Sequence, residues 1–507
     1  MTCRWVSSVL LLLLIWSCDN RLPEAVEFKF RNDSLYLNPS GYAPLSAEFE
    51  VRTNISTSIA IEVIGKDGPN SDVSRSFEQE GRYHRVPVLG LYPDETNEIR
   101  VTFRDSVGTF REEVTYRISI PPLSDDYPEI VIESAVETGA EGWTFVSYFG
   151  HNSTLTPQRP FIYDRSGKIR WTVDFSGHPQ LNNFFYDNGM ERLENGNLFF
   201  GEARTDRIYE IDMLGNVVNS WGMPGFSYHH HTIELPNGNF LLSVTKNDIE
   251  TVEDFLIEVD RNSGAILTTW DLRESLDQTR TTLTEDSVDW IHVNGLAYDP
   301  TDQTVILSGR TQGVVKLSWD NEVQWIISPH QGWSPAGNGE DLTAFLLQPL
   351  DAGSNPISDQ AVLNGAAVHP DFDWVWYQHA PTVLPDGRLL LFDNGFNRAL
   401  GNAPVYSRAV IYDIDQTTMT IRQDWSYGES RGEEAYSFVV SDADYHAESG
   451  TIIMSPGAVS AQPKPYGKVI EIDEQTRQVL NEVTIIPPIA ALQLVTFHRT
   501  ERMSLYP

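Results

Sequence analysis

The sequence contains little cysteine, few basic side chains and no long apolar run. Its 507 residues include 2 cysteines, and 71 acidic side chains outnumber 36 basic ones to give a formal charge of −35. This charge argues against a nucleic-acid partner, because phosphate binding needs clustered lysine and arginine. No run of 18 apolar residues is present to form a membrane-spanning helix. A glycine-rich loop ending in Gly-Lys-Ser or Gly-Lys-Thr is also missing, which argues against an enzyme that binds nucleotide phosphates.

The amino terminus, residues 1–17, is predicted to be a lipoprotein signal peptide. Arg4 gives a positive start, the apolar core of residues 9–16 is too short to span a bilayer, and residues 15–18 resemble a bacterial lipobox. Cys18 is therefore the expected lipidation site of an exported lipoprotein on the periplasmic side of the cell envelope, held to a membrane only by its lipid anchor. The alternative is an ordinary signal peptide cleaved elsewhere, and the leaflet that holds the anchor stays open. Because Cys3 lies within the signal, the mature chain has no second cysteine for a disulfide.

Residues 18–122 are predicted to form a small β-sandwich domain. Apolar and polar residues alternate in short segments with turn-rich joints between them, as expected for strands that bury one face. These segments are residues 26–30, 47–51, 59–63, 98–103 and 113–118. The acidic stretch at residues 123–129 follows two prolines and is predicted to be an extended linker. By itself this domain indicates no chemistry.

Residues 130–507 contain a repeated phrase that predicts a six-bladed β-propeller, so the expected fold class is all-β. Each copy has an aromatic or aliphatic residue, an acidic turn and then an apolar strand that often carries tryptophan. The copies begin at Tyr163, Tyr209, Ile257, Lys316, Tyr412 and Ile470, mostly at spacings in the high forties to fifties. Such a period, with Asn-Gly and Asp-Gly turns, is typical of four-stranded blades. The long gap between Lys316 and Tyr412 is expected to hold an insertion, and this insertion, including Pro329 to Pro356, is a candidate lid.

Three histidines recur at one place in this pattern. His230 and His379 each stand eight residues before the glycine of a turn, and His292 takes the same register before Asp299. A repeat that returns an imidazole to one position is expected to place the three side chains around a common point. The sequence therefore predicts a histidine-lined active site on a symmetric scaffold.

Several short motifs in both predicted domains match one known family. They are residues 38–45 and 86–93 in the first domain, and residues 289–294, 308–313, 378–379 and 393–398 in the second. In this order they resemble the bacterial PAPS-independent aryl-sulfate sulfotransferases. The resemblance covers nearly all of the mature chain. It implies a six-bladed propeller enzyme that transfers a sulfuryl group from an aryl sulfate ester to a phenolic acceptor by a ping-pong mechanism, through a sulfohistidine and without a nucleotide donor.

The resemblance also implies roles for individual residues. His379 is the expected nucleophile, His292 and Arg310 are expected to hold the sulfuryl oxygens, and His230 is the further catalytic residue. Asn294 is a weaker candidate for a substrate contact. These residue types suit the reaction, because a neutral imidazole can attack and leave again, and a planar guanidinium can pair with two sulfuryl oxygens. No cofactor is implied, and the resemblance is compatible with a homodimer.

Some alternatives stay open. The three histidines could instead be structural in a lipoprotein propeller that binds a ligand or partner without catalysis. They could also ligate zinc, but an arginine nearby would repel the cation and no short-spaced ligand motif accompanies them, so no metal is expected. The run from His229 to His231 leaves open which of its members faces the site, although the repeat favours His230. The identity of the donor and acceptor is not readable.

The remaining candidates concern substrate contacts and supporting residues. Aromatic side chains that could line a phenol pocket are Trp290, Trp333, Trp374, Trp376 and Tyr377. The histidines expected to be structural or solvated are His84, His151, His178, His330, His369, His446 and His498. Asp393 and Arg398 are expected to form a turn and a surface salt bridge.

Overall fold

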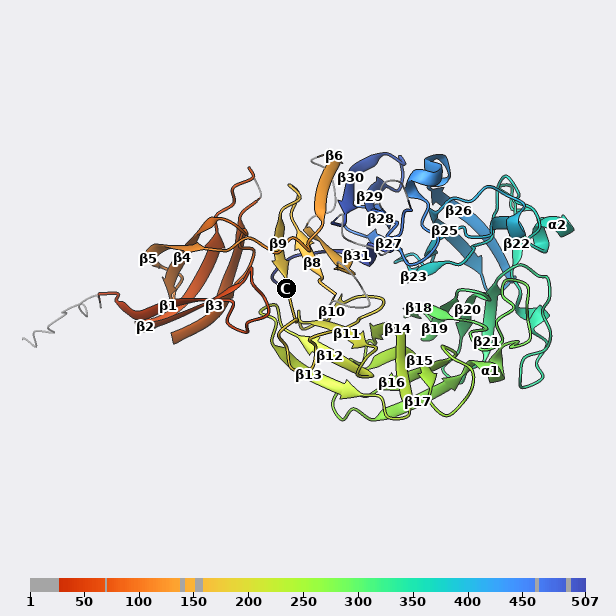
Figure 1. The fold of residues 1–507 in the computed structure, drawn as a ribbon, viewed down its shortest axis with the longest axis horizontal. Coiled ribbons are helices and arrows are strands. Elements are labelled where there is room, and N and C mark those ends of the chain that lie inside the picture. The colour runs from red at the N-terminus through yellow and green to blue at the C-terminus, as the bar shows by residue number, and fades with distance from the viewer. Residues whose placement is uncertain (1–26, 69–70, 137–141, 151–157, 461–464, 489–493) are drawn as a thin grey trace, which may run out of the picture.

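The computed structural model describes residues 27–68, 71–136, 142–150, 158–460, 465–488 and 494–507. The predicted signal peptide, Cys18 and His151 lie outside these ranges. The described strands form one sheet in an N-terminal domain and six further sheets that follow one another around a common centre (Figure 1). Within the described ranges, no helix has the length and apolar character needed to cross a membrane.

The N-terminal domain is built on two long strands. Its five strands are β1 (Phe30–Leu37), β2 (Ala47–Val63), β3 (Val73–Val88), β4 (Thr96–Asp105) and β5 (Phe110–Ser119). β3 pairs along one edge of β2, whereas β1 and β4 pair with successive halves of its other edge, and the register shifts between Arg52 and Thr57. Burial alternates along β2, as expected for a strand with one face in a core. The predicted sandwich strands are thus linked into one antiparallel sheet rather than two separate ones.

The other described strands form six sheets of four or five strands. From the centre outward, the first sheet contains β10 (Glu191–Arg192), β11 (Leu198–Glu202), β12 (Arg207–Ile211) and β13 (Val217–Gly222), and the second contains β14 (Phe226–Glu234), β15 (Phe240–Lys246), β16 (Phe255–Val259) and β17 (Ile266–Asp271). The third, in the same order, contains β18 (Val293–Asp299), β19 (Thr304–Gly309), β20 (Gly313–Leu317) and β21 (Val323–Ile327).

The fourth sheet contains β23 (His379–Val383), β24 (Leu389–Asp393), β25 (Arg408–Asp415), β26 (Thr420–Tyr427) and β22 (Gln348–Leu350). The fifth contains β27 (Asp442–His446), β28 (Thr451–Ser455), β29 (Gly467–Asp473), β30 (Val479–Ile486) and β6 (Glu129–Ala135). The sixth contains β31 (Phe497–Met503), β7 (Trp143–Tyr148), β8 (Phe161–Tyr163) and β9 (Ile169–Thr172). β6 is the outermost strand of one sheet, and β31 is the innermost strand of the neighbouring sheet. The beginning and the end of this part of the chain therefore lie in two adjacent sheets and join them. β6 begins at Glu129, the last residue of the predicted linker.

The repeated phrase has a structural reason. Its six copies fall one per sheet, each on the third strand from the centre. The aspartate of the phrase accepts backbone hydrogen bonds within the following turn, as Asp212 does from the amides of Leu214 and Asn216. The tryptophan of one sheet then donates its indole N–H to a carbonyl in the next sheet's turn, as Trp171 does to Met213 at 2.8 Å. Tryptophans 221, 270 and 425 make the same kind of contact. These four phrases therefore hold the neighbouring sheet as well as forming a turn of their own.

The insertion after Lys316 lies partly at the outer rim. Its regular elements are η1 (Leu342–Phe345), β22 and α2 (Gln360–Leu363). β22 pairs in parallel with β26, the strand farthest from the centre in the original four. This part of the predicted lid therefore extends the outer edge of a sheet (Figure 1). The other short helices of the described chain are α1 (Leu272–Ser275), η2 (Arg398–Gly401) and η3 (Glu429–Ala435).

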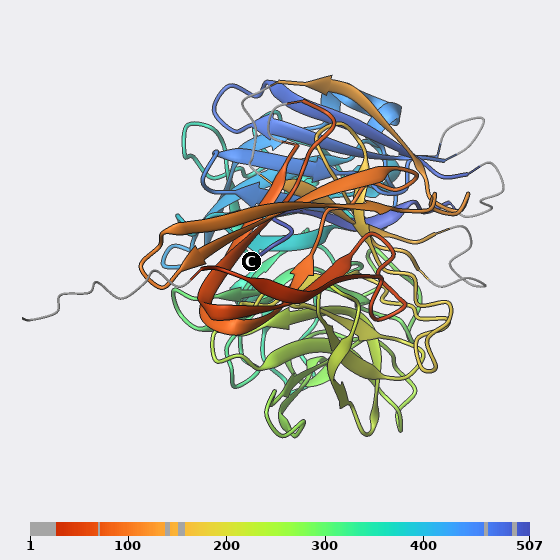
Figure 2. The ribbon, with the colours of Figure 1, turned by 90° about the vertical axis from the view of Figure 1, so that its left-hand side faces the viewer.

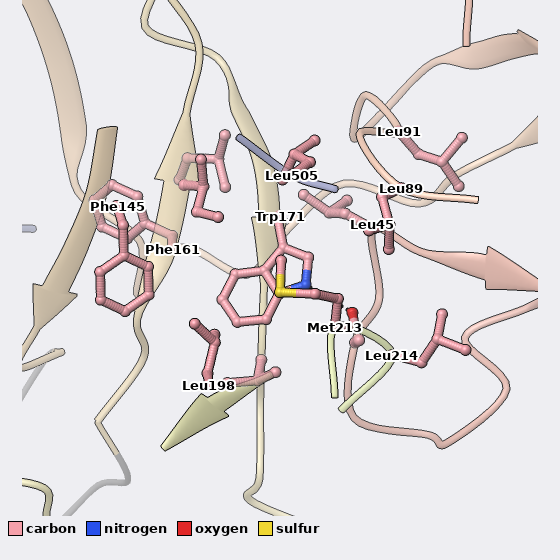
Figure 3. Packing of buried hydrophobic residues seen from close by; sticks show 14 of the residues in the cluster. Leu45, Leu89, Leu91, Phe145, Phe161, Trp171, Leu198, Met213, Leu214 and Leu505 are labelled. Carbon is pink, nitrogen blue, oxygen red and sulfur yellow. Dashed lines mark hydrogen bonds between the residues drawn. The ribbon is translucent and has the colours of Figure 1, made fainter. Parts of the chain in front are cut away.

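In Figure 2 the N-terminal domain lies in front of the six sheets, and the two domains share a core (Figure 3) and polar contacts. Leu45, Leu89 and Leu91 of the first domain pack in one buried cluster with Trp171 and Leu505. Burial of each leucine contributes about 1.5–3 kcal/mol. The guanidinium of Arg170, which is fully buried, donates to the carbonyl of Gly90 at 2.7 and 2.9 Å. The two motifs of the first domain that carried the family resemblance, residues 38–45 and 86–93, thus form the contact with the second.

Candidate active site

Four histidines meet at the inner strands of the six sheets. His230 lies on β14, His292 directly precedes β18, His379 begins β23, and His498 lies on β31. The Nε2 atoms of His230 and His292 are 2.8 Å apart. The ring centroid of His498 lies 5.6 Å from that of His379 and 5.9 Å from that of His230. The three histidines predicted from the repeat are therefore brought together, and a fourth joins them.

The backbone at these histidines is unusual. His230 and His292 adopt left-handed conformations with φ of 56° and 52°, whereas in β23 the left-handed residue is Ala380, with φ of 52°. Such a residue costs on the order of 1–2 kcal/mol. Each lies at or beside a register shift between the inner strand and its neighbour. The three histidines therefore keep the predicted spacing to the turn. In β23, however, the left-handed residue is Ala380, one position after His379, and not the histidine itself.

The tautomer of His379 is determined by Asn394. The Nδ1 atom of His379 lies 2.7 Å from the Oδ1 atom of Asn394. The Nδ2 atom of Asn394 donates to the carbonyls of Ser437 and Val440, each at 2.9 Å. Carbonyls can only accept, so the amide nitrogen must face them and the amide oxygen must face His379. Nδ1 of His379 consequently carries the proton, and Nε2 carries the lone pair.

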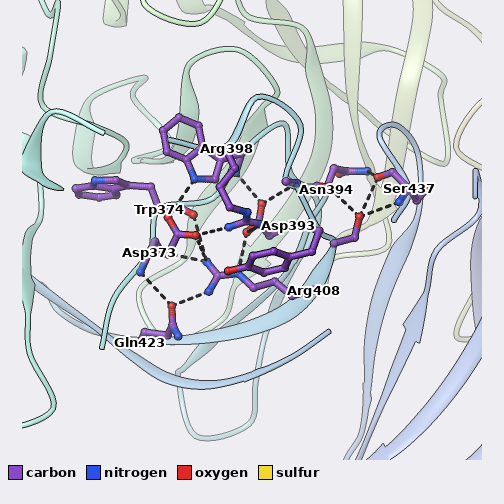
Figure 4. A network of polar contacts seen from close by, with 12 residues as sticks. Asp373, Trp374, Asp393, Asn394, Arg398, Arg408, Gln423 and Ser437 are labelled. Carbon is purple, nitrogen blue, oxygen red and sulfur yellow. Dashed lines mark hydrogen bonds and ion pairs between the residues drawn. The ribbon is translucent and has the colours of Figure 1, made fainter. Parts of the chain in front are cut away.

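Asn394 is held in place by a buried ionic network (Figure 4). The preceding residue, Asp393, accepts from Arg398 at 2.9 Å and from Arg408 at 2.8 Å, and both arginines also contact Asp373. Asp393 and Arg398 are fully buried. The predicted surface salt bridge is thus wrong, because both partners lie in the interior. A buried pair of this kind fixes geometry more than it adds stability.

Burial and charge keep His379 neutral. Its side chain is only 1% exposed. Burial, with the charges of Arg310 and His292 nearby, lowers the pKa of His379 to about 3, despite the hydrogen bond to Asn394 that raises it. A histidine with so low a pKa is an uncharged imidazole at every physiological pH, which is the form that can act as a nucleophile.

His292 has the opposite electrostatic setting. Its Nδ1 atom lies 2.8 Å from Oδ2 of Asp289 and 2.5 Å from Oε2 of Glu253. Burial alone would lower the pKa of His292, but these two carboxylates outweigh it and raise the pKa above the ordinary value of 6.5. In contrast, burial and the neighbouring imidazoles hold the pKa of His230 well below that value. The proton between the two Nε2 atoms therefore belongs to His292, which suits it as a proton donor.

Arg310 joins the site through His292. Its backbone N–H donates to the carbonyl of His292 at 3.0 Å, and its Nη2 atom lies 3.5 Å from Oδ2 of Asp289. The Nε atom of Arg310 has no hydrogen-bond partner among the described residues. A guanidinium with one shared carboxylate and unused N–H groups retains donors for an anion.

The run of three histidines is resolved by contacts. His231 is engaged elsewhere, because its Nε2 atom lies 2.7 Å from Glu191 and its Nδ1 atom accepts from the backbone N–H of Leu296 at 2.9 Å. His229 lies 2.7 Å from Glu253. Of the three, His230 is the one whose ring contacts both His292 and His498.

The weaker substrate candidates lie mostly in supporting positions. The side chain of Asn294 donates to the carbonyl of Gln378 at 2.8 Å, next to His379. Trp290, Trp374 and Trp376 are fully buried within sheet cores, and each indole N–H has a protein acceptor. Tyr377 is only half-buried and packs edge-on against the exposed Phe396, with centroids 4.8 Å apart. Trp333 is also half-buried, but its indole N–H donates to the carbonyl of Pro329 at 3.0 Å and its ring packs against Arg280. Tyr377, two residues before His379 in the sequence, is therefore the best placed of the five predicted aromatics to meet a substrate ring.

No pattern in the sequence points to His498 as a member of the site. It was expected to be structural or solvated, yet it is 2% exposed and both ring nitrogens lack a hydrogen-bond partner in the described part of the chain. Its strand, β31, carries no copy of the histidine phrase. Asn394, Asp289 and Glu253 were likewise missed as supports of the site, although Asp289 and Asn394 lie within motifs of the resemblance.

The site can also be compared with a metal centre. The described residues with suitably grouped ligand atoms are His229, His230, Glu253 and His292, all within 4.8 Å of one another. His379 is not part of this group. The set differs from the three histidines considered as a zinc site from the sequence.

Comparison with known proteins identifies the family. The family model described as "Arylsulfotransferase (ASST)" matches residues 129–488, and "Arylsulfotransferase Ig-like domain" matches residues 34–121. The chain belongs to the arylsulfotransferase family, and the resemblance predicted from the motifs is confirmed. It is therefore an enzyme of the sulfotransferase class with an Ig-like N-terminal domain.

Two relatives extend over most of the chain. The arylsulfate sulfotransferase AssT of Escherichia coli O6:H1 is 28% identical over 550 aligned residues, which cover 89% of this chain and 90% of that protein. The arylsulfate sulfotransferase AssT of Lelliottia amnigena shows the same identity and coverage. Among solved structures, virginiamycin B lyase from Staphylococcus aureus is 10% identical with a TM-score of 0.34, covering 78% of this chain and 94% of that one.

Proposed function

We propose that this protein transfers a sulfuryl group from an aryl sulfate ester to a phenolic acceptor through a sulfohistidine at Nε2 of His379. The observation that carries the proposal is the tautomer of His379, whose Nδ1 proton is held by Asn394 so that the lone pair lies on Nε2. The similarity to arylsulfate sulfotransferases supports the same substrate class. Each of the six sheets is one blade of the propeller that presents this residue.

In the first half-reaction, the Nε2 lone pair of His379 forms a bond to sulfur. The bond between sulfur and the phenolic oxygen breaks, and its electron pair leaves with that oxygen. His292 gives the departing phenolate a proton from Nε2, and Arg310 stabilises charge on the sulfuryl oxygens. The transition state of such a transfer is loose, so positioning and electrostatic stabilisation supply most of the rate.

The second half-reaction reverses these steps with a new phenol. The acceptor gives its proton to His292, and its oxygen forms a bond to sulfur while the bond from sulfur to His379 breaks. Donor and acceptor use one pocket in turn, and ping-pong kinetics follow.

A purified sample tests this function directly. We expect release of a chromogenic phenol from its sulfate ester to depend on an added phenol, with the sulfate ester of the added phenol appearing in equal amount. Phenol release with inorganic sulfate as the sole product would indicate hydrolysis instead. No release under either condition would contradict the proposed substrate class.

We also propose that the mature protein is a lipoprotein anchored through Cys18 on the periplasmic side of the envelope. The lipobox-like residues 15–18 support this location. Cys18→Ser should abolish partitioning with membranes while the rest of the chain still folds, and equal solubility of both forms would contradict it. Since the mature chain contains a single cysteine, activity should not respond to thiol reductants. The homodimer compatible with the resemblance stays a prediction that light scattering can test.

A further inference from the structure

One side of the histidine cluster brings four metal-binding side chains together. The ligand atoms of His229, His230, Glu253 and His292 lie within 4.8 Å of one another. Oε2 of Glu253 is 2.7 Å from Nε2 of His229 and 2.5 Å from Nδ1 of His292. His379 stands outside this group, so the group differs from the proposed nucleophile and its support.

Three of these side chains offer a buried atom that has no hydrogen-bond partner among the described residues. The atoms are Nε2 of His229, Nδ1 of His230 and Oε2 of Glu253. Although some of them are close together, their angles do not make hydrogen bonds. His230 itself is 7% exposed. A buried polar atom without a partner costs about 1–3 kcal/mol. A cation ligated by this group would give all three atoms a partner at once.

We propose that His229, His230, Glu253 and His292 bind one divalent transition-metal ion, of which zinc is the probe, and that the bound ion inhibits the enzyme. Three imidazole nitrogens and one carboxylate oxygen form a four-ligand set suited to zinc and unsuited to magnesium. Zinc–nitrogen bonds of about 2.0–2.1 Å place tetrahedral ligands about 3.3 Å apart. The close pairs, Oε2 of Glu253 with the two histidine nitrogens at 2.5 and 2.7 Å, need to separate by less than about 1 Å to admit the ion. Ligand atoms as far apart as the 4.8 Å limit of the group need to approach by up to about 1.5 Å.

The charges around the group favour a cation despite the nearby Arg310. The guanidinium of Arg310 is already shared with Asp289, at 3.5 Å. Asp289 in turn contacts His292, and Asp187 lies 3.3 Å from Nδ1 of His230 and 3.6 Å from Nδ1 of His229. With Glu253, three carboxylates therefore face the group against one guanidinium. These carboxylates outweigh the repulsion of zinc by the arginine that was expected from the sequence.

Inhibition rests on the function proposed above. A metal ion bound to His292 and His230 holds both rings as ligands, and a metal-bound His292 cannot also carry the extra proton that a cationic proton donor gives up. His229 has no part in the proposed transfer, so it supplies a variant that separates metal binding from catalysis.

Calorimetric titration of the chelator-treated full chain with zinc chloride tests the site without any substrate. We expect one tight zinc site per chain, no site for magnesium, and at least about tenfold weaker zinc binding in His229→Asn and in Glu253→Gln. His446→Asn, a histidine that contacts Ser449 elsewhere on the propeller, is the matched control and should bind zinc normally. Circular dichroism checks that each variant folds. If His229→Asn does not fold, the zinc affinity of Glu253→Gln decides the test.

The outcomes separate the metal site from the proposed function. Zinc should inhibit sulfuryl transfer by the wild-type and His446→Asn enzymes, a chelator should restore it, and His229→Asn should keep its basal activity and resist zinc. Wild-type protein that binds no zinc, or variants that bind it as tightly as wild type, would overturn the site. Tight binding without inhibition would overturn the inhibitory role. If no chain transfers a sulfuryl group, the proposed function fails while the titration still decides whether the metal site exists.

Discussion

The Nδ1 atom of His379 lies 2.7 Å from the Oδ1 atom of Asn394, whose amide nitrogen is held by two backbone carbonyls at 2.9 Å. This relationship assigns the proton to Nδ1 and the lone pair to Nε2. It is reinforced by the ionic network at Asp393, which fixes the neighbouring backbone. The chemistry of the site follows from this one orientation.

Replacing Asn394 should therefore impair catalysis through the tautomer of His379. Asn394→Leu removes the acceptor for the Nδ1 proton, and we expect the rate of transfer to fall on the order of a hundredfold or more. Asn394→Asp keeps an acceptor and should retain more activity than Asn394→Leu. The comparison variant is Asn262→Leu, at an exposed turn. Equal activity of Asn394→Leu and the wild-type enzyme would mean that the amide does not orient the nucleophile.

Arg310 provides a second test. Arg310→Lys keeps the charge but loses the planar fork, so turnover should fall about a hundredfold or more while binding of a neutral phenol changes little. Arg477→Lys, at an exposed position, should have no effect. Steady-state kinetics with an aryl sulfate measure both. Normal turnover of Arg310→Lys would show that the arginine serves only as an ion pair for Asp289.

The pH dependence of the first half-reaction should report His292. The pKa of His379 is lowered to about 3 by burial, so the nucleophile is already neutral at any pH above that value and contributes no acidic limb there. The pKa of His292 is raised above 6.5 by Asp289 and Glu253, which overcome its burial. Its proton is present below that raised pKa and is lost as pH rises through it, so the rate should fall on the alkaline side.

Leaving groups sharpen this pH test. The alkaline fall should be steep for sulfate esters of weakly acidic phenols, which need a proton, and shallow for nitrophenyl sulfate. His292→Asn should be slow at every pH and should lack the fall. A profile of the same shape in the variant and the wild type would exclude His292 as the proton donor.

His498 should make a measurable contribution that a structural residue would not. Both of its nitrogens lack a partner within the described residues, and a buried unpaired polar group costs about 1–3 kcal/mol. We expect the ring N–H to donate to a bound sulfuryl oxygen. His498→Leu should then raise the thermal midpoint and lower kcat/KM by about tenfold. A variant with unchanged kcat/KM would place His498 outside the site, whatever its stability.

Much of the architecture could be predicted because the repeat encodes local physics. An aspartate that caps a turn and a tryptophan that bonds the next turn recur wherever a sheet meets its neighbour, so the sequence reveals them as a period. The clustering of His230, His292 and His379 was predicted for the same reason, since inner strands of successive sheets converge. It could not be predicted that one long strand, β2, joins the two halves of the N-terminal sheet. A shift of pairing register within a strand leaves no trace in the amino-acid composition.

The supporting residues depend on contacts that sequence spacing does not encode. His498 comes from the chain end that closes the ring, where no copy of the histidine phrase exists. Glu253 lies in a loop of another sheet, 39 positions from His292 in the sequence, so only the fold brings the two side chains together. The burial of Asp393 and Arg398 was missed for a related reason: both look like turn residues, and only tertiary packing of Asp373 and Arg408 encloses them.

The most direct test of the account is the covalent intermediate. Protein treated with an aryl sulfate in the absence of a phenol should carry one sulfuryl group on the peptide that contains His379, detected by mass spectrometry at neutral or alkaline pH. Adding a phenol should discharge it. His379→Asn should show neither label nor transfer, His292→Asn should label the same peptide more slowly, and His446→Asn should match the wild type. Label on another residue, or full transfer by His379→Asn, would contradict the sulfohistidine mechanism.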